Sequence, residues 1–193
     1  MAMNYDNLMS LKEEGVEFSY SDRETMLYAL GVGFGRDAMD ENELAYVFEG
    51  GTLKTVPSMA VVLARHTLHA KIGWDYTKVL HGEQRLELFR PLPPEAELIA
   101  DAQITDAYDK GEGKGALILS EINVRLKSDG QPLFKVGATI FARGDGGFGG
   151  PSGNGPAPHP TPDRAPDVTC ELETRVDQAL LYRLNGDRNP LHA

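Results

Sequence analysis

The chain has one cysteine, Cys170, in 193 residues. An intrachain disulfide and a thiolate metal cluster are therefore excluded, which favours a reducing compartment. The sequence also lacks a run of roughly 18 apolar residues, so no membrane span is predicted. Its N-terminus has neither the basic region nor the apolar region of a secretory signal. We therefore expect a soluble protein that works inside the cell.

Positive charge is also scarce, with 19 Lys and Arg against 29 Asp and Glu and a formal net charge of −10. This balance argues against binding to nucleic acid, which requires a basic surface. A few local cations could still hold a phosphate-bearing ligand. There is no His-Glu-x-x-His motif and no paired cysteine, so no metal site is predicted. Without a Gly-x-Ser-x-Gly turn, serine-based acyl transfer is not indicated either.

A segment rich in glycine and proline, residues 144–166, divides the chain. Six of the 12 prolines fall between Pro151 and Pro166, and such a segment buries too little apolar area to order itself. We predict an N-terminal domain over residues 1–143, a linker over 144–166 and the start of a second domain over 167–193. The alternative is a long surface loop within one domain. The tail after the linker is too short to fold alone, so the rest of the second domain is expected beyond Ala193.

Hydrophobic periodicity predicts the elements of the first domain. Ser21 and Glu24 form a capping box that begins a helix ending near Gly31. A short strand is expected over 43–48, and a helix that is apolar nearly all round, hence buried, is expected after Pro57. His66 and His69, near its end, are expected to have no catalytic role. Four alternating runs, 85–88, 98–104, 116–126 and 134–140, predict an antiparallel sheet with one face on a core. A buried helix followed by such strands indicates an α+β hot-dog fold, a sheet wrapped around a central helix. After the linker, a strand is expected over 168–176 and a helix over 177–184, capped by Asp177.

The run Gly-Asp-Arg-Asn-Pro-Leu-His over residues 186–192 carries the main candidate chemistry. Asn189 before Pro190 bends the backbone, which lets Asp187 and His192 converge on one point. Addition of water to an α,β-unsaturated thioester needs such a base and proton donor. The alternative from residue types alone is an Asx-turn with a surface histidine.

The whole run from Tyr182 to His192 resembles the signature of the enoyl-CoA hydratase 2 family, the MaoC-like dehydratases that include the hydratase part of peroxisomal multifunctional enzyme type 2. Other segments are similar to stretches of the same family, so the resemblance covers residues from about 20 to 193. These segments are Tyr28–Gly33, Phe48–Gly50, Leu80–Pro93, Asp109–Gly111 and Gly146–Gly150.

The resemblance implies a double hot-dog enzyme whose C-terminal repeat is catalytic. Asp187 and His192 match the family's catalytic pair, and Asn189 matches the residue that holds the water or orients the pair. Arg188, Pro190 and Leu191 belong to the same motif and are expected at the substrate. His81, Gly82 and Lys110 match positions that line the CoA site, where a lysine suits a phosphate oxygen. The alternative for His81 and Lys110 is a strand-end histidine and a solvated turn lysine.

The implied reaction is hydration of a trans-2-enoyl-CoA to the (3R)-3-hydroxyacyl-CoA, with backbone donors stabilising the thioester oxygen. No cofactor or metal is expected. The partners implied are an acyl-CoA and a second copy in a homodimer, in the cytoplasm of a bacterium or the peroxisome of a eukaryote. The helix that should follow His192 is missing from the sequence, so this chain alone is expected to be inactive unless another chain completes it. Alternatives are a hot-dog acyl-CoA thioesterase, a dehydratase of carrier-linked substrates and a catalytically inactive acyl-CoA-binding chain.

Overall fold

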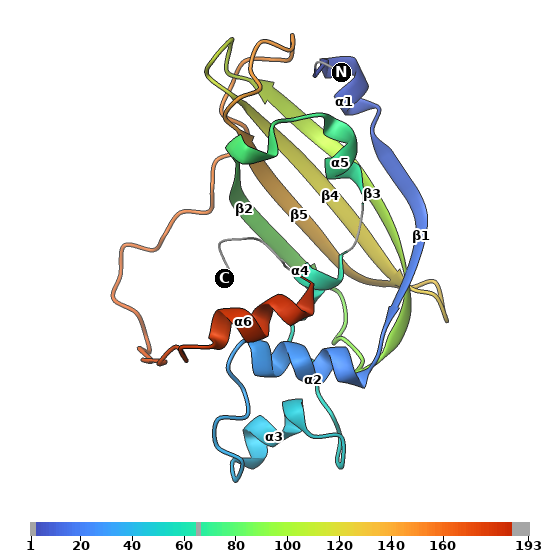
Figure 1. The fold of residues 1–193 in the computed structure, drawn as a ribbon, viewed down its shortest axis with the longest axis vertical. Coiled ribbons are helices and arrows are strands. Elements are labelled where there is room, and N and C mark those ends of the chain that lie inside the picture. The colour runs from blue at the N-terminus through green and yellow to red at the C-terminus, as the bar shows by residue number, and fades with distance from the viewer. Residues whose placement is uncertain (1–2, 65–66, 187–193) are drawn as a thin grey trace.

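The computed structural model describes residues 3–64 and 67–186, which form one antiparallel sheet with short helices on one face (Figure 1). The elements, in chain order, are α1 Tyr5–Met9, β1 Lys12–Tyr20, α2 Asp22–Gly31, α3 Glu41–Val47, α4 Met59–Leu63, α5 Leu68–Ile72, the 3-10 turn η1 Tyr76–Lys78, β2 Val79–Leu88, β3 Ala96–Asp109, β4 Ala116–Leu126, β5 Pro132–Ala142, α6 Gln178–Tyr182 and the 3-10 turn η2 Arg183–Asn185. No helix among these is long and apolar enough to cross a bilayer.

The strands lie in the order β1-β3-β4-β5-β2, and every neighbouring pair is antiparallel. Their register defines two ends of the sheet. At the α2 end, Tyr20 pairs with Ala96 just before α2 begins. At the far end, Val79 pairs with Ala142.

Alternation along the strands gives the sheet one face that packs under the helices. Side chains of β3, β4 and β5 on this face meet Ala29 of α2, Met59 and Leu63 of α4 and Leu68 of α5 in one core cluster. A second cluster at the far end joins the strands to α1, α5 and Trp74. The predicted α+β hot-dog fold is confirmed. Because one face is buried and the other is solvated, period-two alternation was a sufficient signal for β3, β4 and β5.

Residues 43–47 belong to the helix α3 and Phe48 follows its end, so the strand predicted over 43–48 is wrong. The Asp40 side chain accepts the N–H of Asn42 at 2.8 Å and caps α3. Glu41 and Glu43 lie in the first turn, where negative charge stabilises a helix. The apolar letters of this stretch suggested a strand, but the cap and the acidic first turn decide for a helix.

The helix predicted after Pro57 is divided into α4 and α5. Ala64 leaves helical geometry at φ −68° and ψ 76°, and His66 lies outside the described residues. Met59, Ala60 and Leu63 are buried as expected. The strand β1 was missed because a bulge between Glu13 and Val16 interrupts its alternation.

Beyond the sheet, the chain passes through an exposed segment before α6. Residues 156–177 are exposed and carry no helix or strand, so the strand predicted over 168–176 is absent. Val168 and Leu172 are more than four-fifths exposed, and no described strand lies beside them. The helix predicted over 177–184 corresponds to α6 and η2. Asp177 does not cap it, because its carboxylate pairs with Arg175 at 3.0 Å instead.

Candidate active site

The C-terminal segment α6–η2 returns to the α2 end of the sheet and packs along α2 (Figure 1). The Gln178 side chain donates to the carbonyl oxygens of Leu30 at 3.2 Å and Gly31 at 2.5 Å. The ring of Tyr182 lies 6.3 Å from that of Tyr28, centroid to centroid. Residues 147 positions apart in the sequence therefore meet here.

An open cavity of about 670 Å³ lies between α2, α3 and η2. Most of its lining is aliphatic, and one carboxylate and one guanidinium group lie beside each other at the start of α2. The lining residues are Arg23, Glu24, Met26, Leu27, Leu30, Val47, Leu184, Asn185 and Gly186. This cavity borders Gly186, the first residue of the candidate catalytic run.

Gly186 turns the chain out of η2. Its φ is +107°, a region that glycine adopts without strain and other residues adopt rarely. Its N–H donates to Arg183 O at 3.2 Å, which closes the turn. This glycine therefore sets the direction in which the chain leaves toward Asp187.

The candidate catalytic residues themselves, Asp187, Asn189 and His192, lie outside the described residues. So do Arg188, Pro190 and Leu191. The predicted convergence of Asp187 and His192 stays a prediction, and the structure contributes the point from which their segment departs.

Lys110, a predicted CoA contact, has local partners. Its ammonium group donates to Gly153 O at 2.6 Å and to the side-chain oxygen of Asn154. The lysine therefore holds the beginning of the linker against the end of β3. A CoA phosphate at Lys110 would have to share or displace these oxygens.

The neighbouring Asp109 joins two of the family-like segments. Its buried carboxylate accepts N–H groups from Gly111 at 2.8 Å, Gly147 at 2.7 Å and Gly149 at 2.9 Å. Burial alone would raise the pKa of Asp109, but these backbone donors outweigh it and the pKa is lowered. Phe148 is buried between the two bonded glycines. We call this arrangement the Asp109 clasp, and sequence reasoning missed it.

His81 and Gly82 lie on the edge strand β2, and both are exposed. His81 pairs with Ile140, and a register shift follows between His81 and Glu83. Lys110 also lies at the far end, but two strands, β4 and β5, separate β2 from β3. The separation across three strand spacings is roughly 14 Å. The three predicted CoA residues thus share one end of the sheet, away from α2, and do not form a single contact cluster.

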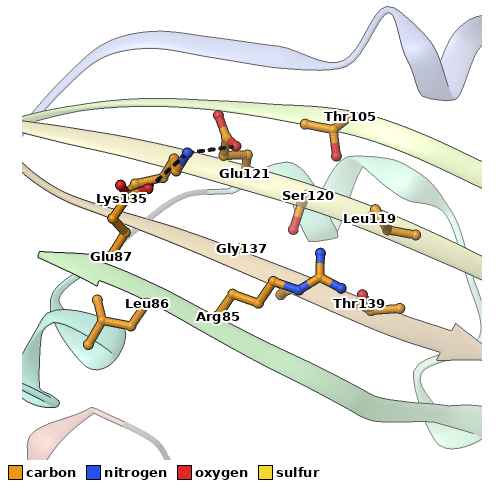
Figure 2. A pocket seen from close by; sticks show the side chains of 11 residues that line it. Arg85, Leu86, Glu87, Thr105, Leu119, Ser120, Glu121, Lys135, Gly137 and Thr139 are labelled. Carbon is orange, nitrogen blue, oxygen red and sulfur yellow. Dashed lines mark ion pairs between the residues drawn. The ribbon is translucent and has the colours of Figure 1, made fainter. Parts of the chain in front are cut away.

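A further hollow of about 290 Å³ lies on the face of the sheet away from the helices (Figure 2). Lys135 contacts Glu87 at 3.2 Å and Glu121 at 3.8 Å, and Arg85 pairs with Glu83 at 2.6 Å. Because its charges neutralise one another and it lacks a histidine, this hollow is a poor site for activating water. Within residues 3–64 and 67–186, no group of three or more metal-binding side chains occurs.

Residues 18–144 match the family model described as the MFE-2 hydratase 2 N-terminal domain. The chain is 38% identical over 97% of its length to the 3-hydroxyacyl-thioester dehydratase Y of Mycobacterium tuberculosis, and covers 64% of that protein. It is 39% identical over 100% of its length to the enoyl-CoA hydratase ChsH3 of the same organism, and covers 68% of it. The chain therefore spans about two thirds of the length of these relatives.

Among solved structures, the MaoC-like dehydratase from Phytophthora capsici superimposes with a TM-score of 0.79. That match has 27% sequence identity and covers 98% of this chain and 67% of the other. A family match over more than half of the chain and relatives above 30% identity agree with the motifs and the sheet described above. The chain belongs to the enoyl-CoA hydratase 2 family of MaoC-like dehydratases.

Proposed function

We propose that this protein is a hydro-lyase that reversibly adds water to a trans-2-enoyl-CoA and yields the (3R)-3-hydroxyacyl-CoA. The observation that carries the proposal is that α6–η2 docks on α2 and brings Gly186, the residue before Asp187, to an aliphatic cavity. Family membership supplies the reaction class, and the uninterrupted motif from Tyr182 to His192 supplies the chemical groups.

In this proposal the oxygen of one water bonds to C3 of the enoyl group while C2 gains a proton. Asp187 and His192 take a proton from the water and deliver one to C2, so that the net change is one added water. Asn189 holds the water or orients the pair. Hydration neither oxidises nor reduces the substrate, so the reaction requires no redox cofactor.

The acyl chain is proposed to enter the cavity beside α2, where Leu27, Leu30 and Val47 offer apolar contact. His81, Gly82 and Lys110 are proposed for the CoA portion, and Arg188, Pro190 and Leu191 for the substrate near the catalytic pair. The proposal includes a homodimer and a location in the peroxisome of a eukaryote or the cytoplasm of a bacterium. Peroxisomal relatives such as the enoyl-CoA hydratase 2 of Arabidopsis thaliana support the former.

The test is a hydration assay on crotonyl-CoA and trans-2-decenoyl-CoA, followed by loss of the enoyl-thioester absorbance, with the full-length gene product. Asp187→Asn and His192→Ala are expected to lower kcat by roughly a thousandfold, within the range for a lost acid or base. Asp163→Asn and His159→Ala change the same residue types in the exposed linker and serve as matched controls. Full activity in both catalytic variants would contradict the assignment of Asp187 and His192 as the catalytic pair.

Two other activities are outcomes of the same assay. Release of free CoA, detected with a thiol reagent, would identify a thioesterase. A strong preference for carrier-protein thioesters over CoA thioesters would identify a carrier-linked dehydratase.

A further inference from the structure

The family-like run Tyr28–Gly33 has no role in the proposed chemistry, yet it forms the last turns of α2 and the residues just beyond it. This is the part of α2 against which α6 and η2 pack. The segment that leads into Asp187 therefore packs on one of the segments that resemble the family. The contacts show which residues make this possible.

Gly31 permits a close approach between the two segments. A Cβ built at Gly31 would lie 2.5 Å from the side-chain nitrogen of Asn185 and 3.3 Å from the Cα of Tyr182. The backbone of Gly31 is helical, so glycine is not needed there for its conformation. The absence of a side chain is used to bring η2 into contact with the end of α2.

Two further contacts orient the segment once it is close. The last carbonyl groups of a helix lack partners within the helix, and the Gln178 amide donates to two of them, on Leu30 and Gly31. Tyr28 is itself fixed, because it is buried and its hydroxyl donates to Ser58 Oγ at 3.0 Å. Its ring then provides a rigid surface for the ring of Tyr182.

We infer that the last turn of α2, Tyr28–Gly31, is a seat that positions the catalytic segment, with Gly31 and Gln178 as positioning residues. The inference rests on the proposed function, because it gives the segment after Gly186 a catalytic role. Asn185, which lies against Gly31 of the seat, is two residues before Asp187 in the chain. A shift of η2 by about 1 Å is therefore carried to Asp187, and displacements of that size cost up to a hundredfold in rate.

The test compares four variants of the full-length protein. Gly31→Ala adds the Cβ that meets Asn185, and Gly31→Ala/Asn185→Ala removes the nitrogen that it meets. Gly51→Ala is the matched control, since a Cβ there has no neighbour within 4 Å and the backbone does not require glycine. Gln178→Ala removes the two hydrogen bonds without adding bulk. Hydration kinetics and amide hydrogen exchange of residues 178–186 are measured for each.

We expect Gly31→Ala to lower kcat by roughly tenfold or more while KM changes by less than about threefold, because substrate still binds but the catalytic groups are displaced. Exchange across 178–186 should rise roughly tenfold while exchange in β3–β5 stays as in the wild type. Asn185→Ala in the same chain should restore both readouts toward wild-type values. Gln178→Ala should show the same direction with a smaller change, and Gly51→Ala should show neither.

Unchanged exchange and unchanged kcat in Gly31→Ala overturn the inference. Raised exchange with unchanged kcat, in a protein that Asp187→Asn inactivates, also overturns it, because the seat then has no effect on catalysis. If the wild-type protein does not hydrate enoyl-CoA, the proposed function fails, and exchange alone decides whether the seat holds 178–186. If Gly31→Ala does not fold, the kinetics and exchange of Gln178→Ala decide.

Discussion

At the scale of single residues, Asp109 has a structural role that the sequence did not predict. The Asp-Lys-Gly match predicted Lys110 as a phosphate contact. In the structure, the Asp109 carboxylate accepts three backbone N–H groups from two segments. Gly147 lies 38 residues further along the chain. Only the pairing of β3 with β4 and of β4 with β5 brings it to Asp109. Local sequence contains no signal for such a contact, so this residue could not be assigned from its neighbours.

We predict that Asp109→Asn lowers the free energy of unfolding by about 2–3 kcal/mol. The amide keeps one acceptor oxygen but turns a donor toward backbone N–H groups, and hydrogen bonds to a charged acceptor are among the stronger ones. Urea unfolding at pH 7 measures the change. Asp163→Asn, in the exposed linker, should stay within about 0.5 kcal/mol of the wild type. Equal stability of both variants would mean that the Asp109 clasp does not hold the chain.

At the scale of elements, a second carboxylate joins β1 to α5. Glu13 accepts the N–H of Thr67 at 2.8 Å, the Thr67 hydroxyl and the ammonium of Lys71 at 2.6 Å. Burial would raise the pKa of Glu13, but the bonds from Lys71 and Thr67 outweigh it and the pKa falls to about 2. The strand β1 was missed in the sequence because of the bulge beside this residue. The residue at which the bulge begins, Glu13, is thus also the residue that contacts α5.

The Glu13 contacts predict how stability depends on pH. The folded pKa is lower than the unfolded one, so the contribution is fully present above about pH 4.5. It is lost as the pH falls toward about 2. Because Lys71 is about half exposed, we expect a contribution of only about 1–2 kcal/mol. Chemical unfolding at pH 7 and at low pH should show Glu13→Gln destabilised at pH 7 and less sensitive to acid than the wild type.

Glu14→Gln is the matched control for this prediction. Glu14 is the next residue, it is 69% exposed and it pairs only at the surface with Lys12. Its removal should leave the acid dependence unchanged. An equal effect of both substitutions would contradict a specific contact between β1 and α5.

Some elements were predicted correctly from the sequence and others were not, and the difference has a physical cause. The strands β3, β4 and β5 were predicted because buried residues alternate with less buried ones over most of each strand. The helix α3 was missed because its apolar letters fit a strand while its capping residue precedes them. Hydrophobic alternation that runs along a strand can be recognised in the sequence. A helix whose position is decided by one capping residue is easily overlooked.

At the scale of the whole molecule, the exposed residues 156–177 carry the chain from one end of the sheet to the other (Figure 1). The strand β5 ends at the far end, while α6 packs on α2, which follows β1 at the opposite end. Composition predicted a linker over residues 144–166, and the motif predicted the family. The return of the tail to α2 could not be predicted, because it depends on contacts such as Gln178 with Gly31 that join residues 147 positions apart.

The span of the sheet sets a minimum length for this exposed segment. The 11 residues of β5 extend over roughly 37 Å, and the exposed residues 156–177 can cover that distance. Deletion of residues 157–170 leaves roughly eight of them, which reach at most about 28 Å. We therefore predict that the deletion frees α6 from α2, with faster hydrogen exchange over 178–186 and loss of hydratase activity. Replacing 157–170 by the same number of Gly and Ser residues should preserve both, because reach and not sequence is required. If the deletion variant keeps α6 protected from exchange, the chain follows a shorter path to α2 than the one along the sheet.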